Sequence, residues 1–196
     1  MQRVLSLPPN APRSKSGKWL QQLAMLILKV GGWKMVGQWP DVPKMVMIAA
    51  PHSSGWDAVW GMAVKAAMGV DIVFIGKAEL FWGPLGWILR KFGGRPVDRS
   101  APGDIIDQIA SQIRNSEKMW FVLAPEGTRK KVANWKSGFW KIAKRADVPV
   151  CCVWFHYPDK TIGVDQLITL SDSFENDMKR IREIYQPYVG KNRKIN

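Results

Sequence analysis

His52 and Asp57 stand five residues apart in the segment 51–57, with small residues and one tryptophan between them. Residues at this spacing do not share a face of a continuous helix, so the two side chains meet only where the chain turns, and Gly55 makes a turn easy. A carboxylate bonded to one ring nitrogen leaves the other facing substrate, and it favours the imidazolium formed when the ring takes a proton. The pair suggests a general base, His52, oriented by Asp57.

The same segment also has a purely structural explanation. Ser54 and Asp57 fit the capping-box pattern, in which two side chains satisfy backbone N–H groups at the first turn of a helix. The pair alone therefore leaves catalysis and helix capping both open.

Two loops that carry arginine favour a binding site. Glu126-Gly127-Thr128-Arg129 follows an apolar run, and the segment 93–99 begins with two glycines and ends in Arg99. Gly127 would allow backbone N–H groups to point at an anion or an oxyanion, and a guanidinium binds phosphate through two parallel hydrogen bonds. Each loop alone is equally well explained as a solvated polar turn. Three polar loops that each follow a β-run, however, converge on one edge of a parallel sheet.

From residue 45 on, short apolar runs alternate with helical patterns. This alternation predicts an α/β fold with a largely parallel central sheet flanked by helices. The expected strands are 45–50, 72–75, 93–97, 119–124 and 148–155, with one or two edge strands in 160–170, and the expected helices are 58–68, 78–92, 104–115, 137–145 and 174–188.

The chain divides into three predicted segments. Residues 1–16, rich in proline, serine and basic residues, are expected to be a flexible basic arm. Residues 17–44 contain an amphipathic helix that either lies at a membrane interface or packs against the core. Its apolar stretch is shorter than the roughly 20 residues that a bilayer span needs. Residues 45–196 form the domain that carries the polar loops.

The 196 residues carry a formal net charge of +13 and include eleven tryptophans. Such a charge implies an anionic partner, and tryptophan is typical both of membrane interfaces and of surfaces that stack on nucleic-acid bases. Basic residues concentrate in 3–44 and 179–194, and no known nucleic-acid-binding pattern occurs. An anionic membrane surface is therefore the expected partner, and no nucleic acid is expected.

Thiol and cofactor chemistry find little support in the sequence. The two cysteines, Cys151 and Cys152, are adjacent within an apolar run, where reactive thiolates do not occur. The chain has two histidines and no Cys/His cluster with metal-ligand spacing, and it lacks the phosphate-loop, dinucleotide-binding and nucleophile-elbow patterns.

Four segments of the chain occur in the order of a known set of motifs. They are His52-x-Ser54-x-x-Asp57, the stretch 94–99, Glu126-Gly127-Thr128-Arg129 and Val148-Pro149-Val150. In order and spacing they resemble the four motifs of the glycerolipid acyltransferases, the 1-acylglycerol-3-phosphate acyltransferase (PlsC-like) family, over residues 45–155. The resemblance identifies 45–196 as an acyltransferase domain of the compact bacterial type.

The resemblance implies roles for individual residues. His52 would take the proton from an acceptor hydroxyl, and Asp57 would orient it and balance its charge. Attack on the acyl thioester would be direct, with no acyl-enzyme and with no bound metal or cofactor. Acyl-CoA or acyl-carrier protein would serve as co-substrate. The residues implied to bind substrate are Arg99, Glu126, Gly127, Thr128, Arg129 and Lys77.

The expected activity is transfer of a fatty acyl group to a free hydroxyl of a lyso-glycerophospholipid. The enzyme would be peripheral, at the cytoplasmic face of the cell membrane. The alternatives are a different lyso-lipid acceptor, or a protein without catalytic activity that binds a membrane surface or nucleic acid.

Overall fold

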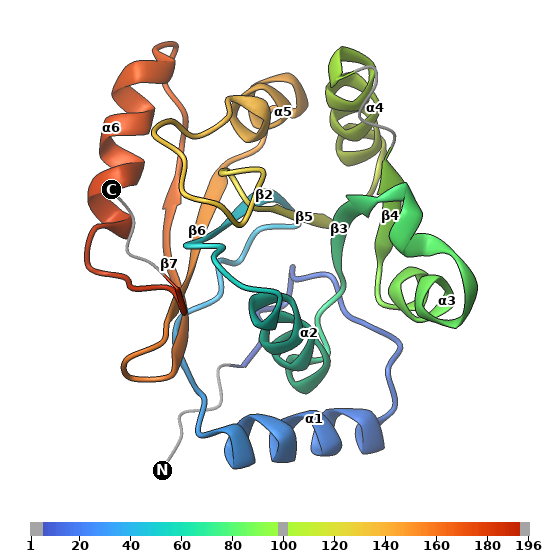
Figure 1. Ribbon diagram of the computed structural model, residues 1–196. Helices are drawn as coiled ribbons and strands as arrows, with labels where there is room; N and C mark the ends of the chain where they lie inside the picture. Colours follow the sequence, from blue (N-terminus) through green and yellow to red (C-terminus); the bar gives the residue numbers. More distant parts are fainter. Residues whose placement is uncertain (1–5, 98–101, 193–196) are drawn as a thin grey trace.

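A seven-stranded sheet forms the centre of the computed structural model, which describes residues 6–97 and 102–192 (Figure 1). The strands lie in the order β1-β7-β6-β2-β5-β3-β4. Their bounds are β1 Lys34–Gly37, β2 Lys44–Ala50, β3 Ile72–Lys77, β4 Gly94–Val97, β5 Met119–Leu123, β6 Val150–His156 and β7 Thr161–Ile168. The strands from β6 to β4 in this order run parallel, whereas β7 is antiparallel to β6 and β1 follows the direction of β7. The predicted α/β fold with a largely parallel sheet is confirmed.

Helices cover both faces of this sheet (Figure 1). They are α1 Lys18–Gly31, α2 Trp56–Met68, the short 3-10 helix η1 Ala78–Phe81, α3 Gly83–Lys91, α4 Pro102–Asn115, α5 Gly138–Ala146 and α6 Phe174–Tyr185. Buried residues of α4, α5 and α6 belong to one apolar cluster, and those of α1 and α2 belong to the other. The sheet is therefore the middle of three layers.

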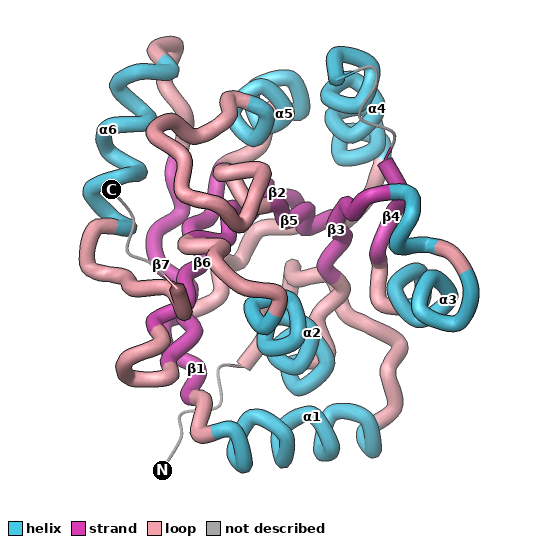
Figure 2. Tube along the Cα trace, in the orientation of Figure 1, coloured by secondary structure: helices cyan, strands magenta, loops and turns pink. Residues whose placement is uncertain are grey.

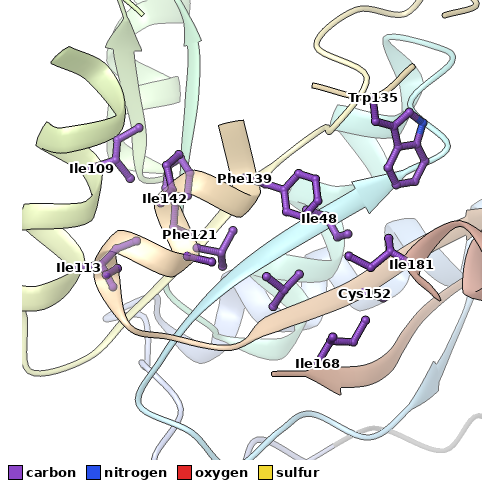
Figure 3. Packing of buried hydrophobic residues seen from close by; sticks show 14 of the residues in the cluster. Ile48, Ile109, Ile113, Phe121, Trp135, Phe139, Ile142, Cys152, Ile168 and Ile181 are labelled. Atoms are coloured by element: carbon purple, nitrogen blue, oxygen red, sulfur yellow. The ribbon is translucent and has the colours of Figure 1, made fainter. Parts of the chain in front are cut away.

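Strand β2 shows why the two clusters form on opposite faces. Val46, Ile48 and Ala50 belong to the cluster under α4, α5 and α6, whereas Met45 and Met47 belong to the cluster under α1 and α2. Successive side chains of a strand point to opposite faces, so a fully apolar strand is buried on both sides. Figure 3 shows Ile48 among side chains of the first cluster from α4, α5 and α6. Both faces of β2 are thus covered by helices, and functional side chains can reach solvent only at its carboxyl end.

Several elements differ from the expectations. Strand β1 (Lys34–Gly37) lies within the segment 17–44, so the helix there ends at Gly31. The Gly-interrupted segment 78–92 forms η1 and then α3, and 160–170 contains the single strand β7. Strand β1 was not expected because four residues with exposed ends carry little periodicity; its pairing with β7 makes it a strand.

Residues 6–16, which belong to the segment expected to be a flexible basic arm, make backbone contacts with the rest of the protein. The backbone N–H of Ser14 donates to the Gly69 carbonyl at 2.8 Å, and the N–H of Asp71 donates to the Pro12 carbonyl at 2.9 Å. Ala11 is buried. These backbone bonds fix the segment against the α2–β3 connection, because a buried backbone polar group is stable only when it is paired.

Helix α1 packs one side on the molecule and exposes the other. Ala24 and Leu28 are buried, whereas Trp19, Leu26 and Val30 are among its exposed apolar residues. Over residues 6–97 and 102–192, no helix combines the length and hydropathy that crossing a bilayer requires.

Candidate active site

The carboxyl ends of the parallel strands bring the predicted site residues together. His52 follows β2, Glu126 follows β5 and Lys77 ends β3. Strand β2 lies between β5 and β6, so the loops that follow β2, β5 and β6 are neighbours at the carboxyl edge of the sheet. Figure 2 shows the loops after β2 and β5 as pink segments near the middle of the view, above the start of α2.

His52 and Asp57 meet across the turn that begins α2. The imidazole Nδ1 lies 3.2 Å from Asp57 Oδ2. The His52 side chain is 28% exposed, whereas that of Asp57 is 1% exposed. With Nδ1 directed at the carboxylate, Nε2 is the nitrogen that carries the lone pair of the neutral ring. A partly exposed base with a buried orienting carboxylate is the geometry that general-base catalysis needs.

Asp57 also holds the turn that precedes α2, although the capping box that the sequence pattern suggests does not form: the N-cap is Gly55, without a side-chain cap. Asp57 Oδ2 accepts hydrogen bonds from the backbone N–H groups of Ser53 and Ser54, at 2.8 and 2.9 Å. The N–H of Trp56 in turn donates to Ser54 Oγ at 3.2 Å. The carboxylate is therefore held rigidly by backbone groups while it faces the imidazole.

The pKa of Asp57 is lowered from its ordinary value of 3.8. Burial acts the other way, because it disfavours the charged form. Hydrogen bonds from His52, from Tyr157 and from the backbone of Ser54 and Ser53 outweigh it. Asp57 is thus an anion at neutral pH and can balance the charge of a protonated imidazole.

Glu126 connects the loop after β5 to the loop after β2. Its side chain is buried, and Oε1 accepts a hydrogen bond from the backbone N–H of His52 at 2.9 Å. The motif resemblance implies that Glu126 binds substrate. In the structure Glu126 also accepts a hydrogen bond from the backbone of His52. A buried carboxylate on a backbone N–H fixes the position of that residue.

The rest of the second loop forms a tight polar turn. Gly127 has φ 65°, the left-handed conformation that favours glycine, and its N–H donates to the Ala124 carbonyl at 3.1 Å. Thr128 Oγ1 accepts from the N–H of Lys130 at 3.2 Å. The N–H of Gly127 therefore closes the turn.

Arg129 reaches the loop of His52. A Cβ added at Gly55 would lie 3.1 Å from Arg129 Nη1. The guanidinium therefore lies over the start of α2, in the space that Gly55 leaves, and Arg129 is exposed to solvent. This arrangement places a fixed positive charge beside the turn that joins His52 to Asp57.

Lys77 lies on the far side of β5 from β2. Lys77 ends β3, is exposed, and pairs in register with Val97, the last residue of β4. Arg99, two positions beyond Val97, lies outside the described residues. The strand before Arg99 thus ends at the same sheet edge as Lys77.

Sequence reasoning missed Tyr157 as a site residue. It follows β6, and its hydroxyl donates to Asp57 Oδ1 at 2.5 Å. Burial, and then its hydrogen bond to Asp57, raise the pKa of the phenol well above its ordinary value, so Tyr157 stays a donor. Its position directly after an apolar strand, like that of His52, was the available signal.

The C-terminal segment also contacts the site. The amide of Asn192 donates to the Ser53 carbonyl at 2.8 Å, and its backbone N–H donates to Ser53 Oγ at 3.2 Å. Lys191 Nζ lies 5.2 Å from the ring centroid of Trp56. Contacts between residues this far apart in sequence cannot be predicted from local sequence patterns.

The two cysteines lie apart from this chemistry. Cys151 and Cys152 are fully buried in β6. Burial raises the pKa of the Cys152 thiol to about 12 and also raises that of Cys151. Neither thiol is a nucleophile at neutral pH, because the reactive species is the thiolate.

The chain is similar to known acyltransferases in sequence and in fold. A protein-family model described as Acyltransferase matches residues 38–156, which include the loops of His52 and Glu126 and the strand before Tyr157. A solved structure, the 1-acyl-sn-glycerophosphate (LPA) acyltransferase PlsC from Thermotoga maritima, has the same fold with a TM-score of 0.62 and 18% sequence identity. The similarity covers 85% of this chain and 75% of that one. No curated protein matches the chain.

Proposed function

Because the chain belongs to the Acyltransferase family, we propose that it transfers a fatty acyl group from an acyl thioester to a free hydroxyl of a lyso-glycerophospholipid. The observation that carries this proposal is the 3.2 Å contact between His52 Nδ1 and Asp57 Oδ2, at the edge where three loops meet. The contact supplies an oriented base, and the reaction needs one to deprotonate a hydroxyl.

The proposed reaction proceeds by direct attack. His52 Nε2 takes the proton of the acceptor hydroxyl as its oxygen bonds to the thioester carbonyl carbon. The C–S bond then breaks, and the imidazolium returns the proton to the departing thiolate, so the products are an ester and a free thiol. Asp57, ionised and held by the N–H groups of Ser53 and Ser54, stabilises the imidazolium while it exists.

The acceptor phosphate is assigned to the basic residues at the edge. Arg129 lies over Gly55, close to the turn of His52, and its guanidinium can donate two parallel hydrogen bonds to phosphate oxygens. Lys77, which ends β3, and Arg99, which the motif resemblance marks for the acceptor phosphate, complete the proposed set. Glu126, Gly127 and Thr128 shape this region: Glu126 holds the His52 backbone, and Gly127 and Thr128 form the turn that precedes Arg129.

The proposed location is the cytoplasmic face of the cell membrane, where the enzyme is peripheral. Helix α1 exposes Trp19, Leu26 and Val30 next to Lys18 and Lys29, while its opposite side packs on the protein. An apolar stripe bordered by lysines is the pattern of a helix that lies in a membrane interface. The acyl donor, acyl-CoA or acyl-carrier protein, would arrive from the aqueous side.

The substrate assignment is tested by identifying the product. The purified protein is incubated with acyl-CoA or acyl-carrier protein and, separately, with lysophosphatidate, lysophosphatidylglycerol and a monoacylglycerol without phosphate, and mass spectrometry identifies new esters. We expect diacyl products from the phosphorylated acceptors. Acylation of monoacylglycerol alone would contradict the assignment of the acceptor phosphate.

A further inference from the structure

A second apolar face lies on η1 and α3, away from α1. Five large apolar side chains there are exposed, with Trp82 at 82% and Trp87 at 64%, together with Leu80, Leu85 and Ile88. Figure 1 shows α3 at the end of the sheet beyond β4. A nine-residue helix that presents such side chains to water, with two tryptophans in its segment, marks a surface for an apolar partner.

This face is held in a fixed shape. Gly86 packs against the backbone of Phe81 so closely that a Cβ would collide with its carbonyl group. Arg90 Nη2 donates to the Phe81 carbonyl at 3.3 Å, and the guanidinium carbon lies 5.3 Å from the centroid of the buried Phe81 ring. The helix is thus folded back on η1 while Trp82 and Trp87 stay exposed, so the apolar face exists before any partner binds.

The charges around the face are mainly positive. The exposed basic residues of the segment 77–95 are Lys77, Arg90, Lys91 and Arg95, and its one acidic residue is Glu79. Lys91 Nζ lies 4.9 Å from the centroid of the Trp87 ring. Tryptophan side chains next to lysine and arginine suit the headgroup region of an anionic bilayer, where the rings enter the interface and the cations meet phosphates.

We propose that η1 and α3 form a membrane-docking element, separate from α1, that binds an anionic lipid bilayer through Trp82, Leu85, Trp87 and Ile88. The element starts directly after Lys77, at the sheet edge that holds His52, so docking would bring the bilayer surface to the entrance for a lipid acceptor. The proposal deepens the proposed function, since it rests on a lipid substrate for that entrance.

The test measures binding to vesicles and needs no turnover. Vesicles of phosphatidylcholine with phosphatidylglycerol are sedimented with the wild-type protein, with a Trp82→Ser/Trp87→Ser variant and with Leu167→Ser. Leu167 is an exposed apolar residue of β7, on another part of the surface, and serves as the matched control. We expect the double variant to lose at least about tenfold in partition coefficient, from the apolar area that two indole rings would bury, and Leu167→Ser to bind like wild type.

An unchanged partition coefficient in the double variant, with thermal unfolding like that of wild type, would overturn the proposal and leave this face to a protein partner. A loss of binding in Leu167→Ser as large as in the double variant would also overturn it. Failure of the proposed function is a separate result: the absence of any acyl transfer by wild type would count against the reaction and would not change the vesicle measurement.

Discussion

The hydroxyl of Tyr157 donates to Oδ1 of Asp57 at 2.5 Å, across a separation of 100 residues in the chain. The other carboxylate oxygen faces His52 and two backbone N–H groups. The orientation of the carboxylate is therefore fixed from both sides, by the turn after β2 and by the residue after β6. In the proposed mechanism Tyr157 is a positioning residue, since it would act on His52 through Asp57.

Replacing Tyr157 with Phe removes only the hydroxyl. We expect kcat to fall about tenfold, the effect of losing about 1.5 kcal/mol from a hydrogen bond to a charged group, while KM for donor and acceptor stays unchanged. Tyr188→Phe is the matched control, because the Tyr188 hydroxyl donates to Asp165 at 3.1 Å, a bond of the same kind in β7. A rise in KM with constant kcat, or equal losses in both variants, would show that Tyr157 has no positioning role.

Arg129 is expected to act on the acceptor alone. Arg129→Gln should raise KM for a phosphorylated acceptor by about 10- to 100-fold, since hydrogen bonds to a charged group contribute about 1.5–3 kcal/mol, and should leave KM for the acyl thioester unchanged. Lys130→Gln removes a neighbouring exposed charge and serves as the control. Equal effects of the two substitutions would mean that only the general positive charge of the loop matters.

The lowered pKa of Asp57 predicts a pH dependence of stability. In the unfolded chain an aspartate ionises near pH 3.9, so its folded carboxylate adds its full stabilisation above that pH and loses it as pH falls through the lower folded pKa. Urea unfolding of wild type and Asp57→Asn should therefore differ most above about pH 4 and converge below it. Asp172→Asn, at a fully exposed carboxyl, should follow wild type throughout. A difference between wild type and Asp57→Asn that grows on acidification would contradict this account.

Burial of the two cysteines predicts that thiol reagents do not modify them in the native protein. With the pKa of Cys152 raised to about 12 and both side chains inside β6, an aromatic disulfide reagent at pH 8 should modify neither thiol until urea unfolds the protein. Rapid modification of a native thiol, with loss of acyl transfer, would instead support thiol chemistry at this strand.

The strands and helices could be predicted from the sequence where the apolar periodicity is strong. The apolar run 45–50 and the helical pattern that follows it predict β2 and α2, and His52 between them falls at the carboxyl edge as expected. The contact of His52 with Asp57 follows from the same local turn. These features depend on neighbouring residues, whose types and spacing are visible in the chain.

Features that depend on distant residues were beyond the sequence. Tyr157 reaches Asp57 only because β6 lies beside β2, and Glu126 reaches the backbone of His52 only because β5 lies on the other side. Strand order is set by packing of the whole sheet, and no local pattern reports it. Strand β1 was missed for the same reason, since it is a strand only through its pairing with β7.

The most direct test of the central claim is thiol release from acyl-CoA in the presence of lysophosphatidate, in vesicles, by wild type, His52→Ala and His156→Ala. His156 is the other histidine of the chain and controls for the loss of an imidazole. We predict that turnover falls by about 10²–10⁴-fold in His52→Ala, the usual contribution of a general base, and persists in His156→Ala, with all three proteins folded. Turnover by folded His52→Ala at the wild-type rate would contradict the assignment of His52 as the base.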